Sequence, residues 1–229
     1  MRQHKINIHA LDSIKTDIQT HSPHPLLVNV IAVTKTFNYT SILSAKENQL
    51  LFIGENKVQE FLLKKNEKPN IDRGLETHLI GHLQSNKVKK AVGLFNVIQT
   101  VDSFKIAQKI NNKAKEKNLN QKIYIQINIG SDPNKYGFIL ENIYSIIDRI
   151  EQYHNLHLVG LMTILPFYKD ITNTQPLFAH MKEIQLKVLK DISPTCKFLS
   201  MGMSRDYVYA LKEGATHLRI GTKLYGQRT

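Results

Sequence analysis

Cysteine and long hydrophobic runs are almost absent from this chain, and tryptophan is missing. Cys196 is the only cysteine, so an internal disulfide is excluded, and there is no CxxC pair or Cys/His quartet of the kind that holds structural zinc. No stretch of about 18 apolar residues occurs, which argues against a transmembrane helix. Residues 1–22 lack the apolar core of a secretory signal, and Asp12 and Asp17 argue against a mitochondrial presequence. These absences together predict a cytoplasmic protein.

The chain is strongly basic. Its 229 residues include 31 Lys or Arg and 19 Asp or Glu, a net charge of +12. Such a charge favours nucleic acid binding, but the lysines are spread along helical patterns such as 105–117 and 182–190, and no RNA-binding motif with interleaved aromatic residues is present. The basicity is therefore interpreted mainly as a solvated outer face. A basic RNA-associated barrel stays open as a minor alternative.

Short apolar runs alternate with helical patterns along the whole chain. The runs that indicate strands cover residues 27–33, 50–53, 78–80, 95–101, 122–128, 157–162, 198–201 and 217–220. The helical patterns cover residues 39–47, 58–65, 85–92, 139–152 and 175–190, with others opening at 103 and at 205. This alternation implies parallel strands with crossover helices. It predicts a single (β/α)8 TIM barrel that spans residues 1–229 as one domain.

An extra helix is predicted before the first strand. Leu11, Ile14 and Ile18 would share one face of it. Residues 1–24 are therefore interpreted as an N-terminal capping helix and its loop.

Two turns near the end of the chain predict a phosphate site. The turns Gly202-Met203-Ser204 and Gly221-Thr222 each follow an apolar run, and each places free backbone N–H groups and a hydroxyl at the start of a helical pattern. In a (β/α)8 barrel the loops after the seventh and eighth strands are a frequent phosphate site. The spacing Gly221 to Gly226 also fits a P-loop, but Gln227 stands where that motif has lysine, so nucleotide binding is not favoured.

Lys35 and Arg219 are the candidate charged groups of this site. Lys35 ends an otherwise apolar strand and could form a Schiff base with an aldehyde, or it could simply pair with Glu55. Arg219 shares a strand face with Gly221 and could face a ring nitrogen, or it could form a salt bridge to Asp206 or Glu213.

A metal site is not favoured. His78 and His82 have the spacing of a helical metal pair but lie on a predicted strand and its turn.

Several motifs of the chain resemble one known family. They are AVTK at 32–35, GENKVQE at 54–60, HLIGHLQSNKVK at 78–89, LMTI at 161–164, LSMGMSRD at 199–206 and RIGTKLYG at 219–226. Their order and spacing resemble the pyridoxal phosphate homeostasis proteins, the YggS/PROSC-type group related to the barrel domain of alanine racemase. The resemblance extends from about residue 27 to residue 228.

The resemblance implies pyridoxal 5′-phosphate as the cofactor. It implies an internal aldimine on Lys35 and phosphate contacts from Ser204, Gly221 and Thr222. It further implies that Arg219 lies near the pyridine nitrogen and that Asn56 lines the cofactor. The sequence departs from the family pattern at Thr34 and Lys57, neither of which is assigned to cofactor binding.

The resemblance implies a carrier and regulator of the cofactor, with no catalytic residue assigned. Racemisation needs a base on each face of the substrate, and only Lys35 is evident. The second domain of alanine racemases is not expected here, which favours a monomer. Cofactor storage and transfer, with pyridoxal phosphate-dependent apo-enzymes as recipients, is therefore expected, and a weak racemase-like enzyme is the alternative.

Overall fold

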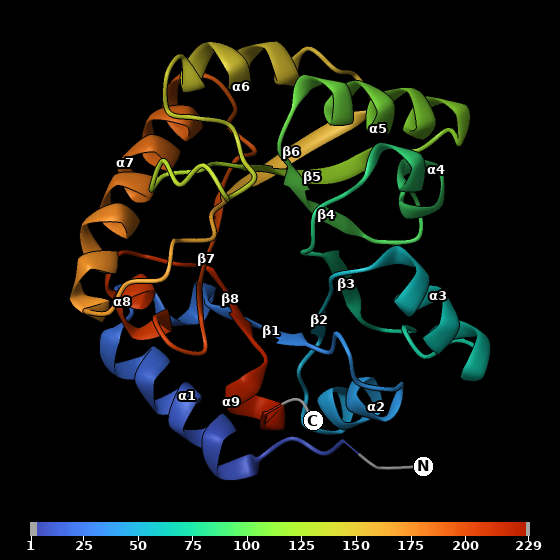
Figure 1. Cartoon of the computed structure of the whole chain (residues 1–229), viewed down its shortest axis with the longest axis vertical. Helices are drawn as coiled ribbons and strands as arrows, with labels where there is room; N and C mark the ends of the chain where they lie inside the picture. The colour runs from blue at the N-terminus through green and yellow to red at the C-terminus, as the bar shows by residue number, and fades with distance from the viewer. Residues whose placement is uncertain (1–3, 228–229) are drawn as a thin grey trace.

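The computed structural model describes residues 4–227, and its strands form one closed barrel (Figure 1). Strands that follow each other in the chain are neighbours in the barrel, all pairings are parallel, and the last strand closes the ring against the first. The strands are β1 Asn29–Val33, β2 Phe52–Glu55, β3 Glu76–Leu79, β4 Val97–Val101, β5 Gln121–Gln126, β6 Leu156–Met162, β7 Phe198–Met203 and β8 His217–Ile220. The TIM barrel expected from the sequence is therefore confirmed.

Helices surround the barrel on its outside (Figure 1). The α-helices are α1 Ile8–His21, α2 Thr40–Glu47, α3 Val58–Glu67, α4 Val88–Ala91, α5 Phe104–Glu116, α6 Ile143–Glu151, α7 Gln175–Asp191, α8 Tyr207–Lys212 and α9 Thr222–Tyr225. Short 3-10 helices are η1 Pro25–Leu27, η2 Ser85–Lys87 and η3 Ile171–Thr174. No helix within residues 4–227 is long and apolar enough to cross a membrane.

The first helix, α1, takes the position in the outer ring that the last helix of such a barrel usually occupies. In the part of the chain that the structure describes, α9 alone follows β8, and its four residues are too few to cover that strand. Instead α1 contacts α8 and α9, and it buries Leu11, Ile14 and Ile18. The N–H of Asn7 fixes the start of α1 by donating to the carbonyl of Leu224 at 2.8 Å. The expected N-terminal helix is thus present, but it covers the side of the barrel (Figure 1).

Two of the expected helices differ from the observed ones because of local backbone conformation. The helix expected over 139–152 begins only at Ile143, since Asn142 has a φ of 58° in the left-handed region. The helix expected over 85–92 is a 3-10 turn followed by the short α4, which ends at the extended Val92 and at Gly93 with a φ of 77°. Residues 1–3 and 228–229 of the expected domain and motifs lie outside the described residues.

The strand register brings several strand ends together at one end of the barrel. Val33 pairs with Gly54 across β1 and β2, and Ala32 pairs with Ile220 across β1 and β8. The residues that follow these three strands therefore emerge side by side. Parallel barrels build their ligand sites from such carboxyl ends.

The barrel interior mixes apolar and polar side chains. Val97, Tyr124, Val159 and Met162 form an apolar cluster there. Several polar side chains on the strands are also buried, namely His78, Gln99, Ser200, His217 and Arg219. Buried polar groups of this kind need hydrogen-bond partners, which they find in one another. These hydrogen bonds orient Arg219 in the site described below.

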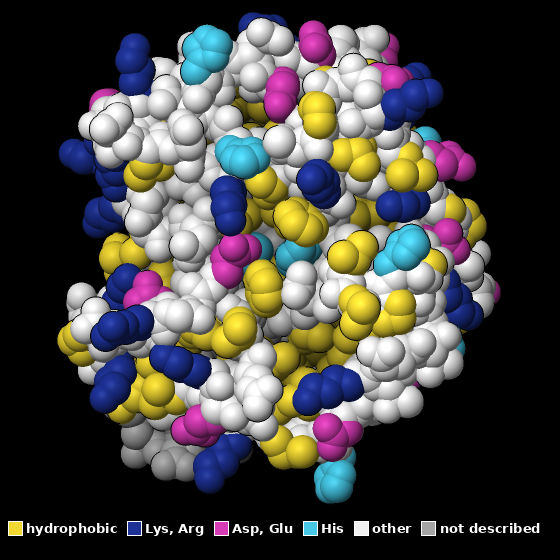
Figure 2. All heavy atoms as spheres, turned by 180° about the vertical axis from the view of Figure 1, so that it is seen from behind, with side chains coloured by type: hydrophobic (Ala, Val, Ile, Leu, Met, Phe, Trp, Pro, Cys, Tyr) yellow, Lys and Arg dark blue, Asp and Glu magenta, His cyan; other side chains and the backbone are white. Residues whose placement is uncertain are grey.

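The basic residues of the surface are dispersed on the face seen from behind. Figure 2 shows Lys and Arg side chains there as separate spots among neutral, acidic and hydrophobic ones. That distribution agrees with the interpretation of the basicity as a solvated outer face.

Candidate functional site

One cavity of about 230 Å³ brings together all six residues expected to bind the cofactor. They are Lys35, Asn56, Ser204, Arg219, Gly221 and Thr222. The other residues that line it are Val33, Ile80, Ile164, Met203 and Arg205. We call this cavity, at the carboxyl ends of the strands, the mouth pocket. It lies where (β/α)8 barrels carry their ligands.

Lys35 reaches the mouth pocket because the alternation of β1 continues beyond the end of the strand. Side chains two residues apart share one face of a strand, and both Val33 and Lys35 line the pocket. The Lys35 side chain is half-buried. The carboxylate of Glu55, weighed above as its partner, accepts hydrogen bonds from Lys64 Nζ and Thr34 Oγ1 at 2.6 Å each. As a lining residue, Lys35 contributes an amine to the mouth pocket.

The turns after β7 and β8 meet at the mouth pocket. The hydroxyl oxygen of Ser204 accepts the backbone N–H groups of Gly221 and Lys223, both at 3.3 Å. These distances are long for N–H···O bonds, so a charged phosphate oxygen would be a stronger acceptor for the same donors. Thr222 adds a hydroxyl, and its N–H lies at the start of α9, where no helical carbonyl can accept it. The residues present therefore fit a phosphate group held from two sides.

Arg219 is buried at the floor of the mouth pocket, with 4% of its surface exposed. Its Nη1 donates to Ser200 Oγ at 2.7 Å, and its Nη2 donates to the carbonyl of Thr163 at 2.6 Å. Burial lowers the pKa of Arg219 to about 10, and the charge of Asp206 partly opposes this shift. The guanidinium thus remains charged at neutral pH and is held by neutral acceptors.

The mouth pocket is cationic. Lys35, Arg205 and Arg219 line it, and among residues 4–227 no Asp or Glu belongs to its lining. Glu213, weighed above as a partner of Arg219, accepts a hydrogen bond from Gln175 at 2.7 Å instead. The field in the pocket therefore favours an anion.

A polar chain behind Arg219 was not foreseen from the sequence. Ser200 Oγ donates to Gln99 Oε1 at 2.7 Å, and Gln99 Nε2 lies 2.8 Å from His78 Nδ1. Burial lowers the pKa of His78, so its ring is neutral and Nδ1 can accept from Gln99. His78 Nε2 lies 3.1 Å from Glu76 Oε1, a close contact without good hydrogen-bond alignment. The sequence indicated these hydrogen bonds only through the polar residues that stand within apolar strands.

Asn56 lies where the mouth pocket meets a neighbouring cavity of about 350 Å³, since it lines both. Its backbone packs directly against Gly81. A Cβ atom added at Gly81 would lie 2.3 Å from the carbonyl oxygen of Asn56. The absence of a side chain at residue 81 therefore sets the position of Asn56.

The two histidines weighed as a metal pair lie in different surroundings. His78 is inside the barrel, whereas His82 is exposed, 2.8 Å from Asp102 Oδ2, with its ring stacked on Tyr136. Among residues 4–227 no group of three or more His, Cys, Asp or Glu side chains could hold a metal ion.

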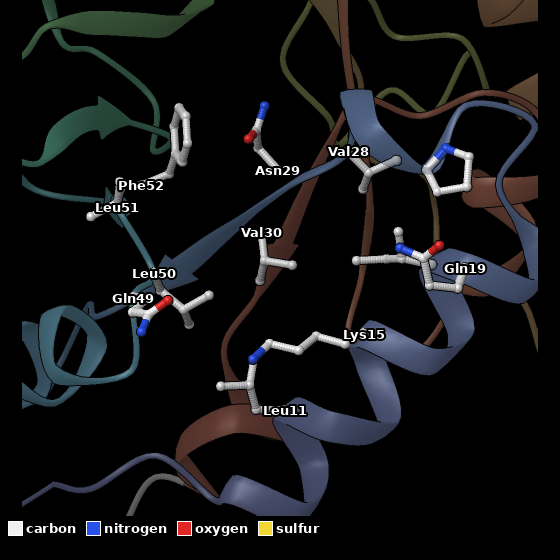
Figure 3. A pocket seen from close by; sticks show the side chains of 12 residues that line it. Leu11, Lys15, Gln19, Val28, Asn29, Val30, Gln49, Leu50, Leu51 and Phe52 are labelled. Atoms are coloured by element: carbon white, nitrogen blue, oxygen red, sulfur yellow. The ribbon is translucent and has the colours of Figure 1, made fainter.

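A cavity of about 320 Å³ at the side of the barrel has a different character (Figure 3). It lies between α1 and the first residues of β1 and β2, where Leu11 and Lys15 lie across from Val30 and Leu50 (Figure 3). Of the described residues that line it, Lys15 alone is ionisable. The mouth pocket is thus the better candidate for an anionic ligand.

Comparisons with known proteins agree with this geometry. The family described as "Alanine racemase, N-terminal domain" matches residues 6–229. The chain is 37% identical over 175 residues to a pyridoxal phosphate homeostasis protein of Aquifex aeolicus, covering 76% of each chain. It is 36% identical over 204 residues to the protein of that name in Synechocystis sp., covering 89% of this chain and 93% of the relative.

A solved structure is also closely similar. PipY of Synechococcus elongatus PCC7942 with PLP bound has a TM-score of 0.82 and 32% identity, with coverage of 95% of this chain and 99% of PipY. The structure of PipY without PLP gives a TM-score of 0.85.

Proposed function

The chain belongs to the pyridoxal phosphate homeostasis protein family, and from this premise we propose that it binds pyridoxal 5′-phosphate in the mouth pocket. The observation that carries the proposal is the meeting of an amine, a set of phosphate donors and a buried guanidinium in one cationic cavity. The similarity to PipY, whose solved structure has PLP bound, supports the same ligand.

Lys35 would hold the ligand covalently, as an internal aldimine. Lys35 would supply the amine for a condensation with the aldehyde of the ligand, which releases water. Arg205 and Arg219 line the same pocket. The amine that would react thus shares its pocket with two further cations.

The remaining pocket residues would orient the ligand. Ser204, Gly221 and Thr222 would hold the phosphate through hydroxyl and backbone donors, and Asn56 would line the ligand. Arg219 can only donate, so a ring nitrogen facing it would accept the hydrogen bond and stay unprotonated. Such a ring withdraws electrons weakly, which suits a carrier better than most pyridoxal phosphate-dependent reactions.

A carrier is favoured over an enzyme because the mouth pocket offers no second base. Besides Lys35, the described residues that line it include only two arginines as ionisable groups, and arginine does not give up its proton readily. Racemisation would need another proton acceptor on the opposite face of the substrate. We therefore propose that a cytoplasmic, single-domain monomer stores the cofactor and passes it to pyridoxal phosphate-dependent apo-enzymes.

The test is the absorption spectrum of the protein with pyridoxal 5′-phosphate, followed by borohydride reduction and peptide mass mapping. We expect a yellow imine band and a reduced adduct on Lys35. Lys35→Ala should lose the band. The control Lys57→Ala, which removes an exposed lysine next to Asn56, should keep it. A stable adduct on other lysines only would refute the proposed role of Lys35.

A further inference from the structure

A buried ionic cluster lies behind the mouth pocket, between β2 and α3. Glu55, the last residue of β2, is 1% exposed, and Lys64 of α3 is 3% exposed. Lys64 Nζ lies 2.6 Å from Glu55 Oε1 and 3.1 Å from Glu60 Oε1, one turn earlier on α3. We call Glu55, Glu60 and Lys64 the anchor cluster.

The anchor cluster binds both neighbours of Lys35 in the chain. On one side, Thr34 Oγ1 donates to Glu55 Oε1 at 2.6 Å, and Lys64 Nζ donates to the carbonyl of Thr34 at 2.8 Å. On the other side, the N–H of Thr36 donates to Glu60 Oε1. Three hydrogen bonds thus fix the backbone on either side of Lys35.

The segment that is held in this way has an unusual backbone. Thr36 has a φ of 68°, in the left-handed region that β-branched residues rarely adopt. Such a conformation persists only where the surroundings enforce it, and it is found preferentially at functional sites. The bond from Thr36 to Glu60 supplies that enforcement.

General stability does not account for the cluster. Burying two opposite charges costs about as much as their attraction returns, so a buried ion pair is weak evidence for stabilisation. Burial raises the pKa of Glu55 even though Lys64 opposes the shift, and within the described residues its Oε2 has no hydrogen-bond partner. The contacts of the cluster, in contrast, converge on residues 34–36.

The next lysine of α3 provides a comparison. Lys65 forms an ion pair of the same length, 2.6 Å, with Asp72 at the surface. Within the described residues, no hydrogen bond joins that pair to Thr34 or Thr36. The two adjacent lysines therefore form similar ion pairs in different surroundings.

We propose that Glu55, Glu60 and Lys64 are positioning residues that fix the backbone at Thr34 and Thr36 and thereby direct the Lys35 side chain into the mouth pocket. This inference rests on the proposed function, because it assigns the cluster a role in the reaction of Lys35 with an aldehyde. A lysine side chain has four rotatable bonds, so a fixed base limits the volume that its amine samples. Misplacement of a reacting group by about 1 Å can slow a reaction on the order of 100-fold.

The test separates the covalent step from ligand binding. The rate of imine formation with pyridoxal 5′-phosphate is measured by stopped-flow absorbance. The affinity for pyridoxamine 5′-phosphate, which has no aldehyde, is measured by calorimetry. The double variant Glu55→Gln/Lys64→Met removes both buried charges together, which folded proteins usually tolerate. We expect its imine formation to slow on the order of 100-fold, while the affinity for pyridoxamine 5′-phosphate stays within about twofold.

Two further variants and a control complete the design. Glu60→Ala removes the acceptor of the Thr36 N–H. We expect imine formation to become about tenfold slower, because one hydrogen bond that fixes the backbone is lost. Glu60→Gln keeps an acceptor oxygen and should restore most of the rate. Lys65→Met removes the neighbouring surface charge and should leave the rate unchanged.

The outcomes distinguish the two proposals. If the parent protein forms no imine on Lys35, the proposed function fails and the positioning role falls with it. If the parent protein forms the imine and both Glu60→Ala and the double variant match its rate, only the positioning role is overturned. Should the double variant fail to fold, Glu60→Ala decides alone, since the Glu60 side chain is 23% exposed and its replacement leaves the Glu55–Lys64 pair intact.

Discussion

Gly81→Ala is expected to weaken ligand binding by displacing Asn56. A Cβ atom at residue 81 would lie 2.3 Å from the carbonyl oxygen of Asn56 and 2.7 Å from its Cα, whereas ordinary contacts begin at 3.4 Å. Because the obstacle is backbone, no side-chain rotation can relieve the clash. The Asn56 backbone must therefore move by roughly 1 Å. Since Asn56 lines the mouth pocket, its side chain moves with it.

The size of the effect follows from the contacts that would be lost. One hydrogen bond from Asn56 to the ligand contributes about 1 kcal/mol, which corresponds to roughly fivefold to tenfold in affinity. Overpacking should also lower the free energy of unfolding by about 1–3 kcal/mol. For a chain of this length that corresponds to a fall in melting temperature of roughly 2–4 °C per kcal/mol.

The assay combines an absorbance titration with pyridoxal 5′-phosphate and urea unfolding without ligand. Gly160→Ala is the matched control, because a Cβ atom there would lie 2.3 Å from the carbonyl oxygen of Phe198 at the start of β7. That clash is of the same size, but it lies away from the mouth pocket. We expect both variants to lose stability and only Gly81→Ala to lose affinity. Equal affinity in the two variants would refute the assigned place of Asn56.

Two further predictions concern the phosphate donors and the barrel interior. Ser204→Ala should weaken the binding of pyridoxal 5′-phosphate by about 10- to 100-fold, because it removes a hydrogen bond to a charged group. The affinity for pyridoxal, which has no phosphate, should stay unchanged. Equal losses of affinity for both ligands in calorimetry would contradict a phosphate contact. Burial lowers the pKa of His217 to about 3. His217 therefore binds a proton more readily in the unfolded chain than in the folded one. Its contribution to the free energy of unfolding should be complete above pH 6.5 and should be lost as the pH falls toward 3. The unfolding free energy of His217→Gln, measured in urea at several pH values, should depend less on pH, and a curve parallel to that of the parent protein would count against this assignment.

The sequence was sufficient to predict the barrel, and the six residues expected to bind the cofactor line one cavity of it. That they bind the cofactor stays a prediction. Periodic apolar runs specify strands and helices locally, and the parallel pairing of the strands follows from their alternation with helices. Lys35 and Ser204 were identified because each follows a strand, and the carboxyl ends of parallel strands converge at one end of the fold. Both arguments need only positions along the chain.

The partners inside the barrel could not be predicted in the same way. Ser200 and Gln99, which together orient Arg219, are 101 residues apart in the chain, and their contact depends on strands β7 and β4 facing each other across the barrel. Asp206 and Glu213, which were considered as salt-bridge partners of Arg219, are the acidic residues nearest to it in the sequence. Proximity along the chain therefore suggested an acidic partner for Arg219. In the folded barrel its hydrogen bonds go to the hydroxyl of Ser200 and the carbonyl of Thr163 instead.

The anchor cluster shows that a charged residue in an apolar stripe carries structural information. The buried residues of α3 are Val58, Phe61 and Lys64, spaced three apart, so Lys64 lies on the stripe that faces the barrel. A lysine at such a position must find a counter-charge within the fold, because an unpaired buried charge is not tolerated. Glu55, buried at the end of the preceding strand, meets that requirement. This reasoning, applied to the apolar stripe of the helical pattern 58–65, would have pointed from the sequence to residues that surround Lys35.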